Sequence, residues 1–269
     1  MMDAASSLLF EHVRDLPFFR GLLRAIESRA YQQVQFESPV LDLGCGDGHF
    51  AQVTFADKIA VAIDPLGEHV REAHKRNIYG LVTEGTGVNL PFPDGYFASA
   101  FSNSVLEHIS DPNPVLAELA RVVRPGGLFV FCVPNDKLLS SLAISQWMEK
   151  YKLRKLAKAY RYFFNKVSRH YTSENIESWT RRLSDAGFMV EKAWDIIPRS
   201  TFRIIEIGHY LGIPSWILRK TIGVWNIVRH PANFAPLLVW LQNYYVEPTP
   251  QTDGVYSFYI TRRRVSEPK

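Results

Sequence analysis

Cysteine is scarce in this chain of 269 residues, which contains only Cys45 and Cys132. Two cysteines are too few for the disulfide framework that stabilises small secreted domains. The first residues also lack the basic stretch followed by an apolar core that marks a signal peptide. We therefore expect a protein of the reducing cytoplasm.

Long apolar runs and biased tracts are missing as well. No window reaches the roughly 18 uninterrupted apolar residues that a membrane-spanning helix needs. The chain has no internal repeat, and its shares of 46% hydrophobic and 22% charged residues are ordinary for a globular protein. Disordered, collagen-like and coiled-coil proteins are thereby excluded, and a soluble or membrane-peripheral protein is expected. The net charge of +4 becomes informative only where the basic residues cluster.

From residue 39 onward, apolar segments typical of strands alternate with helical segments. Strands are expected at 39–43, 59–63, 97–102, 128–133, 189–194 and 255–261, and helices at 49–55, 68–77, 115–123 and 173–186. A turn is expected at 125–127, and one or two further helices at 8–34, interrupted near Pro17. This alternation predicts βαβ units and a parallel sheet that is covered on both faces.

Two long segments, 136–170 and 198–252, lie outside this alternation. Both are apolar or amphipathic rather than rich in glycine and serine, so we interpret them as ordered helical insertions and not as linkers. The sequence predicts one domain over 1–269. Its core covers about 38–135, 171–197 and 253–263, with N-terminal helices at 4–37 and the two insertions forming a helical cap.

The most specific motif is a glycine-rich loop that follows the first strand. The pattern is Asp42-x-Gly44-x-Gly46-x-Gly48, and Asp64 ends the next strand. Glycines allow a tight turn and a close approach of the backbone to a ligand. A carboxylate at the end of the second strand is suited to accept hydrogen bonds from the two hydroxyls of a ribose. Together these features predict a nucleoside site at the carboxyl edge of the sheet.

Several ordered motifs then identify a family. They are VLDLGCGDGHF at 40–50, AIDP at 62–65, LPFPDGYF at 90–97, SNSVLEHISDP at 102–112, ELARVVRPGGLFVFCVPN at 118–135 and DAGF at 185–188. In these motifs the chain resembles the class I S-adenosylmethionine-dependent methyltransferases, in particular the type 11 group related to the ubiquinone and menaquinone biosynthesis methyltransferases. The resemblance implies an α/β fold with a Rossmann-like, doubly wound, seven-stranded and mostly parallel sheet that carries helical cap insertions.

The same resemblance implies the cofactor and the residues that hold it. S-adenosyl-L-methionine would be the methyl donor and S-adenosyl-L-homocysteine the product. The positions that match the family's cofactor-binding motifs are Asp42, Gly44, Cys45, Gly46, Asp64, Pro65, Thr86, Gly87 and Asn103. Thr86 departs from the family, which usually has an aspartate there for the adenine amino group. Adenine recognition must then use the threonine hydroxyl, a backbone group or water.

Methyl transfer from a sulfonium is an in-line displacement, so positioning of the acceptor can supply most of the catalysis. His108 is the candidate for a catalytic base, and the alternative is a residue that packs beside the cofactor without moving a proton. Glu107, His108 and Asp111 have no recognisable metal-ligand spacing, so no metal site is expected. His170 is interpreted as preceding a capped helix start rather than as a catalytic residue.

The segment 150–167 predicts a strongly basic amphipathic helix. Three interpretations remain open: a cap helix with a solvated basic face, a helix that binds an anionic membrane surface, and a nucleic-acid-binding surface. Nucleic acid is disfavoured because the aromatic residues do not interleave with the cations. The many apolar residues of 198–252 favour a hydrophobic acceptor that binds beneath this apolar insertion.

The sequence therefore predicts a methyltransferase that acts on a small or lipid-like, hydrophobic acceptor. It would be cytoplasmic, or peripheral on the inner face of the membrane. Two alternatives stay open: a non-catalytic nucleoside-binding module of the same fold, and an RNA methyltransferase, which would bind RNA with a steep salt dependence.

Overall fold

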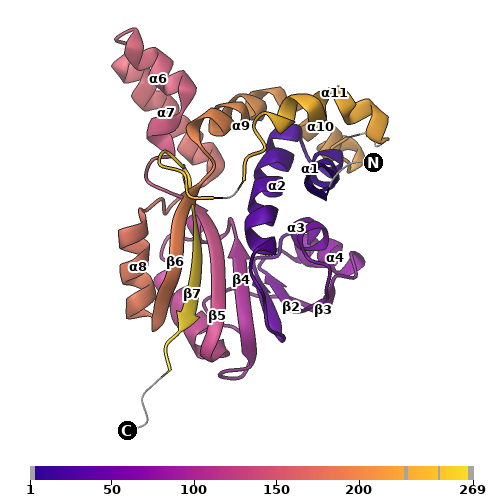
Figure 1. Cartoon of the computed structure of the whole chain (residues 1–269), viewed down its shortest axis with the longest axis vertical. Coiled ribbons are helices and arrows are strands. Elements are labelled where there is room, and N and C mark those ends of the chain that lie inside the picture. The colour runs from indigo at the N-terminus through magenta and orange to yellow at the C-terminus, as the bar shows by residue number, and fades with distance from the viewer. Residues whose placement is uncertain (1–3, 227–229, 248, 266–269) are drawn as a thin grey trace.

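A computed structural model describes residues 4–226, 230–247 and 249–265 of the chain, and it contains one seven-stranded sheet (Figure 1). The predicted domain boundaries and the insertion 198–252 therefore include residues outside the described part, namely 1–3, 227–229, 248 and 266–269. The strands are β1 (Val40–Leu43), β2 (Ile59–Asp64), β3 (Tyr79–Glu84), β4 (Phe97–Asn103), β5 (Val123–Pro134), β6 (Phe188–Ile196) and β7 (Tyr256–Arg263).

The strand order is β3-β2-β1-β4-β5-β7-β6. The pairs that β1, β2, β3, β4 and β5 make with one another are parallel, whereas β7 runs antiparallel to both β5 and β6. The chain moves outward from β1 in one direction to β3 and then returns to β4 on the other side. The carboxyl ends of β1 and β4 therefore flank the point where the order reverses, which is where ligands bind in such sheets. The predicted α/β fold is confirmed.

Helices cover both faces of the sheet. On one face lie α5 (Asn113–Val122) and α8 (Ile176–Asp185), whose apolar side chains form one core with Leu41, Leu43 and Val61. The other face has its own core, which includes side chains of α1 (Ala4–Asp15), α2 (Phe18–Gln32), α3 (His49–Thr54) and α4 (Gly67–Lys75). Successive strand residues point to opposite faces, so the continuous apolar runs of the strands serve both cores.

The two insertions form a cap at the carboxyl edge of the sheet. The first contains the short helix η2 (Leu139–Ser141) and the hairpin of α6 (Ala143–Lys150) and α7 (Arg154–Ser168), and the second contains α9 (Arg199–Leu211), α10 (Ile213–Ile222) and α11 (Pro231–Gln242). In Figure 1, α9 to α11 extend across the top of the molecule beside α1 and α2, while α6 and α7 project away from the body. None of the helices in the described ranges is both long and apolar enough to cross a bilayer.

Three expectations about elements need correction. The strand β3 was not expected, because only one of the six residues of this edge strand is buried and the strand gives no long apolar run. The expected turn at 125–127 lies inside β5, where Gly126 has φ 77° and the register against β4 shifts. The predicted basic helix 150–167 begins only at Arg154, because Lys152 has φ 60° and separates α6 from α7.

Candidate cofactor and acceptor site

The residues expected to bind the cofactor meet at the carboxyl edge of the sheet. They lie in β1 and on the loop that follows it, at and just after the end of β2, at the end of β4, and just after β3. Backbone bonds hold these segments together: the N–H of Gly44 donates to the carbonyl of Ile63 at 2.8 Å, and the N–H of Gly85 donates to the carbonyl of Asp64 at 3.1 Å. The neighbouring ends of β1, β2 and β3 therefore form one continuous surface. We call this surface, together with the end of β4, the platform.

Two glycines of the loop have different structural tasks. Gly44 has φ 80°, and a Cβ there would lie 2.5 Å from a methyl group of Val105, so the loop and the segment after β4 pack too closely for any side chain. Gly46 has φ 55°, and a Cβ there would meet nothing within 4 Å. The loop is thus packed on one side and open at Gly46, where a ligand can approach the backbone.

Asp64 fixes this loop to the end of β2. Its Oδ2 accepts the N–H of Gly46 at 2.9 Å, and its Oδ1 accepts the N–H of Leu66 at 3.0 Å. The ring of His69 lies 3.1 Å from the same Oδ1, and this imidazole is 41% exposed. A carboxylate has about four acceptor positions, so one is left over and another opens when the exposed ring moves aside. Asp64 is therefore suited to accept ribose hydroxyls.

Asp42, in β1, and Cys45, in the loop that follows this strand, are both buried. The phenol of Tyr79 donates to Oδ2 of Asp42 at 2.7 Å, yet burial raises the pKa of this carboxyl to about 7. Burial also raises the pKa of the Cys45 thiol, which makes a thiolate nucleophile unavailable.

Pro65, Thr86 and Gly87 lie on the segments that follow β2 and β3. Pro65 and Thr86 are not buried, and the carbonyl of Thr86 accepts the N–H of Asn89 at 3.3 Å. The hydroxyl of Thr86 remains accessible to a ligand. Leu66, which the sequence analysis did not single out, is 54% exposed and presents an apolar surface next to Asp64.

Asn103, at the end of β4, connects the platform to α2. Its Nδ2 donates to Oε2 of Glu27 at 2.9 Å, whereas its buried Oδ1 has no hydrogen-bond partner in the described structure. Arg24 donates through Nη1 to the same Glu27 oxygen at 2.6 Å and to the hydroxyl of Ser104 at 2.8 Å. Sequence reasoning missed Arg24 and Glu27, since nothing in the helical pattern of α2 indicates that it crosses the strand ends.

His108 lies in the short helix η1 (Leu106–His108), just beyond β4. Its Nδ1 is 3.0 Å from the carbonyl of Arg169, and burial lowers its pKa. Glu107 and His170 lie next to it, so that one donor atom from each of the three residues falls within 4.8 Å of the others. The sequence indicated no metal cluster, because His170 follows 62 residues later and only the folded chain brings it here.

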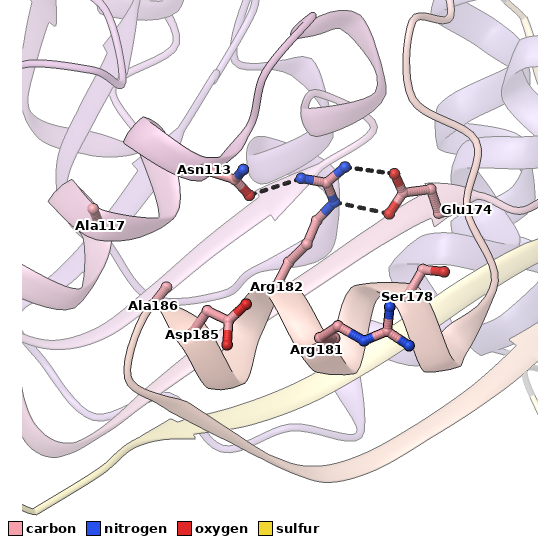
Figure 2. A pocket seen from close by; sticks show the side chains of 8 residues that line it. All are labelled: Asn113, Ala117, Glu174, Ser178, Arg181, Arg182, Asp185 and Ala186. Atoms are coloured by element: carbon pink, nitrogen blue, oxygen red, sulfur yellow. Dashed lines mark hydrogen bonds and ion pairs between the residues drawn. The ribbon is translucent and has the colours of Figure 1, made fainter.

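Hollows also occur in the described part of the chain that are lined by residues away from this platform. The one in Figure 2 has a volume of about 550 Å³ and lies between α5 and α8. Arg182 spans it, with bonds of 2.8 and 2.7 Å to the carboxylate of Glu174 and one of 2.8 Å to Oδ1 of Asn113. These bonds engage all three nitrogens of the guanidinium, so the hollow is interpreted as a structural contact between two helices.

The residues of the platform fit S-adenosylmethionine in three respects. Open space adjoins the backbone at Gly46, a carboxylate ends β2, and an unpartnered buried acceptor, Oδ1 of Asn103, lies where an ammonium group could donate to it. These features occupy the switch point of the sheet, where a nucleoside and its attached amino acid can lie along the strand ends.

Comparisons with known proteins agree with this fit. The family described as "Methyltransferase domain" matches residues 41–131. Malonyl-[acyl-carrier protein] O-methyltransferase of Pectobacterium atrosepticum is 33% identical over 105 residues, which cover 39% of this chain and 42% of the relative. The chain spans about two fifths or less of the length of such curated relatives.

Solved structures extend the likeness of the fold over almost the whole chain. A methyltransferase from Thermotoga maritima, described as a possible histamine N-methyltransferase, has a TM-score of 0.54 at 18% identity, covering 92% of this chain and 91% of that chain. Geranyl diphosphate C-methyltransferase from Streptomyces coelicolor has a TM-score of 0.52 at 14% identity, covering 92% and 83%.

The fold and the platform are similar to those of the class I S-adenosylmethionine-dependent methyltransferases. Within that class, residues 41–131 match the methyltransferase domain family named above, and the cap is built on to this shared core.

Proposed function

We propose that this protein transfers a methyl group from S-adenosylmethionine to a hydrophobic, lipid-like small molecule. The observation that carries the proposal is the loop Gly44–Gly48, which is hydrogen-bonded to the carboxylate of Asp64 at the carboxyl edge of the sheet. When bound, the cofactor supplies an activated methyl group, which moves from the sulfonium sulfur to the acceptor. The protein then has mainly to orient two reactants and exclude water.

The proposed cofactor pose assigns each part of the ligand to residues of this chain. Asp64 holds the ribose hydroxyls, the exposed side chain of Leu66 covers one face of adenine, and the hydroxyl of Thr86 serves its polar edge. The methionine part follows Gly46 to Asn103. Arg24, whose bonds to described residues use Nη1 only, has other N–H groups for the cofactor's carboxylate.

His108 is the proposed base for an acceptor that must lose a proton. Because a carbonyl can only accept, the Nδ1 that faces Arg169 is the protonated nitrogen, which leaves Nε2 able to take a proton. The lowered pKa keeps the ring neutral at pH 7.

The cap supports the choice of a hydrophobic acceptor. Large apolar side chains remain exposed on α9 to α11: Ile207, Leu211, Ile217, Ile222, Val239 and Trp240. One solved relative of this fold is named for geranyl diphosphate, and a curated relative is named for malonyl-acyl-carrier protein. The geranyl group of the first name is a hydrocarbon chain, which agrees with a hydrophobic acceptor.

We also propose that the tip of the α6–α7 hairpin, residues 147–158, contacts an anionic membrane surface, which places the protein on the cytoplasmic face of the inner membrane. The tip exposes Trp147, Tyr151, Leu153 and Leu156 together with Lys150, Lys152, Arg154, Lys155 and Lys158. Its acidic residue, Glu149, is paired with Arg161 at 2.5 Å. Apolar groups that enter the interface among lysines that face phosphates are typical of peripheral membrane segments.

The apolar face of α7 has a buried part and an exposed part. Ala157 and Phe164 are buried, and the phenol of Tyr160 donates to Glu206 of α9 at 2.7 Å, so one part of this face packs on the cap. Leu156, Phe163 and Val167 remain exposed. The first part agrees with a cap helix, and the second, unburied part supports membrane contact.

Calorimetric titration with S-adenosylmethionine tests the cofactor site. Asp64→Ala should weaken binding at least tenfold, equivalent to about 1.4 kcal/mol, because the ribose hydroxyls lose their acceptor. Asp185→Ala, which removes an exposed carboxylate from α8, is the matched control and should bind like the wild type. Equal affinities for both variants would contradict the proposed pose.

Production of S-adenosylhomocysteine, measured with lipid extracts and with small polar acceptors, tests the reaction. Turnover with lipids is the expected result. Cofactor binding without turnover on any acceptor would favour the non-catalytic module, and RNA binding that falls steeply with salt would favour the RNA methyltransferase.

Flotation with lipid vesicles tests the hairpin tip. Lys152→Gln with Lys155→Gln should lower the affinity for vesicles that contain phosphatidylglycerol by at least about tenfold, since each lysine near an anionic surface contributes about 1 kcal/mol. Lys75→Gln with Lys192→Gln removes two exposed lysines elsewhere and should have little effect. Equal binding to neutral vesicles, or dimerisation through the tip, would contradict the proposal.

A further inference from the structure

We propose that Glu107, His108 and His170 form a binding site for one divalent transition-metal ion beside the methyl-transfer site. The three residues come from two segments, the short helix after β4 and the loop between α7 and α8. Two imidazoles and one carboxylate are a ligand set typical of zinc, manganese, cobalt or iron(II) rather than of calcium. Binding of the ion does not depend on S-adenosylmethionine, whereas the role of the ion in the reaction rests on the proposed function.

The distances suit an ion that lies between the three side chains. Nε2 of His108 is 4.0 Å from Oε1 of Glu107, and donor atoms of all three residues fall within 4.8 Å of one another. Because metal–nitrogen and metal–oxygen bonds are about 2.0–2.2 Å long, the ligand atoms of a tetrahedral ion lie about 3.3–3.6 Å apart. Binding therefore requires the donor atoms to approach one another by up to about 1.5 Å, which side-chain rotations can supply.

His108 has the tautomer that a metal ligand needs. Its Nδ1 lies 3.0 Å from the carbonyl of Arg169, and a carbonyl can only accept, so the proton is on Nδ1. The lone pair of Nε2 therefore faces the proposed ion. A backbone carbonyl that holds the far nitrogen of a histidine in this way is a recurrent feature around metal sites.

Two polar atoms of the cluster are buried without a partner. Oε2 of Glu107, a residue only 1% exposed, and Nδ1 of His170 have no hydrogen-bond partner in the described structure. Leaving such atoms without a partner destabilises the fold, because they have lost their water and gained no hydrogen bond. An ion bound to the cluster would give the carboxyl group and the imidazoles the partner that they lack.

Backbone hydrogen bonds hold the two segments in a fixed relation. The carbonyl of Glu107 accepts the N–H of Tyr171 at 2.7 Å and the N–H of Thr172 at 3.2 Å, and the hydroxyl of Thr172 donates to the carbonyl of Ile109 at 3.1 Å. His170 is thereby placed against His108, with their ring centroids 5.4 Å apart. The nearby cation, Arg24, is paired with Glu27 at 2.6 Å, which reduces its repulsion of a metal ion.

The position of the cluster suggests a role for the ion. Glu107 and His108 follow Asn103 by only a few residues, and His108 is 45% exposed, so the ion would be accessible from the acceptor side. A bound divalent ion can hold an oxygen of the acceptor and lower the pKa of a hydroxyl group. With the ion in place, Nε2 of His108 is a ligand, and the ion takes over the task of the base.

Titration of the chelator-treated full chain with Co²⁺, read by visible absorption and by metal content after dialysis, tests the site. The expected result is one ion per chain, displaced by Zn²⁺. Glu107→Gln and His170→Gln should each weaken binding by at least about tenfold, the smallest loss typical even of residues that only support the metal ligands. His74→Gln, an exposed histidine at the end of α4, is the matched control.

Thermal unfolding of each variant distinguishes loss of metal binding from loss of the fold. His170 is partly exposed, so His170→Gln should leave the buried core intact. Binding of S-adenosylmethionine by the same variants, measured by calorimetry, should be retained, so that failure of the metal site and failure of the cofactor site are distinguished. No stoichiometric Co²⁺, or equal binding by His170→Gln and the wild type, would overturn the proposal.

Discussion

At the scale of single residues, burial determines the chemistry of the platform. Asp42 has the phenol of Tyr79 as a donor at 2.7 Å, yet its pKa rises to about 7 because the charged form has lost its water. Asp47, in the loop that follows β1, behaves in the opposite way: burial raises its pKa, but Arg76 and the N–H of His49 lower it overall. Two aspartates of one short motif therefore differ in charge state because only one of them has a cationic partner.

The raised pKa of Asp42 predicts how stability depends on pH. Between about pH 4 and pH 7 the folded protein keeps a proton that the unfolded chain releases, so this residue makes the fold less stable as the pH rises through that window. Asp42→Asn removes the effect. The variant should gain stability relative to the wild type up to pH 7, by at most roughly 4 kcal/mol, and the difference should stay constant above it.

Urea unfolding of both proteins at several pH values measures this difference. Asp47→Asn is the contrasting control, because its lowered pKa stabilises the fold at neutral pH, and the variant should lose stability there. A stability difference for Asp42→Asn that does not change between pH 4 and pH 7 would show that the carboxyl is not buried as described.

At the scale of elements, the contact between α9 and α2 attaches the cap to the core. A Cβ on Gly208 would lie 2.3 Å from Cβ of Phe19, so the two helices touch through backbone and ring. Farther along the cap, Arg219 of α10 binds both carboxylate oxygens of Glu72 in α4 at 2.8 Å. The helical pattern of 198–252 predicted helices here, but it could not indicate which helix each would meet.

Gly208→Ala should therefore loosen the cap. The added methyl group has no room beside Phe19, and overpacking of this kind typically costs about 1–3 kcal/mol. Ile207→Ala, on the neighbouring exposed position of the same helix, should change the stability by less than about 0.5 kcal/mol. Thermal unfolding measures both changes, and equal effects would show that α9 does not pack on α2 in this way.

At the scale of the whole molecule, the structure combines a deeply buried sheet with a projecting hairpin. The central strands β1 and β4 are almost completely buried, whereas most residues at the tip of the α6–α7 hairpin are exposed. Regions with few buried apolar contacts open at lower free energy than the core. The molecule should therefore have at least two levels of local stability.

Hydrogen exchange measured by mass spectrometry should show this difference. Peptides from β4 and β5 should exchange most slowly, and peptides that cover 147–158 should exchange fastest among the helices of the cap. Addition of S-adenosylmethionine should protect 44–48 and 64–66 and leave 176–185 unchanged. Protection that is uniform over the chain, or confined to the hairpin, would contradict the assignment of the cofactor site.

Local patterns of a few to a dozen residues were enough to predict the glycine loop, Asp64, the alternation of strands and helices and the likeness to the methyltransferases. They also indicated the helical nature of both insertions. They missed β3, since an edge strand with only one buried residue has no long apolar run, and they placed the start of the basic helix four residues too early.

Packing of the folded chain brought Arg24 and Glu27 of α2 to the end of β4, and His170 to Glu107 and His108. Arg24 bonds to Ser104, which follows it by 80 residues, and His170 follows His108 by 62. No local pattern records such pairs, because they depend on how the helices pack over the strand ends. Spacing along the chain fixes the elements, whereas the packing of buried surfaces fixes which side chains meet.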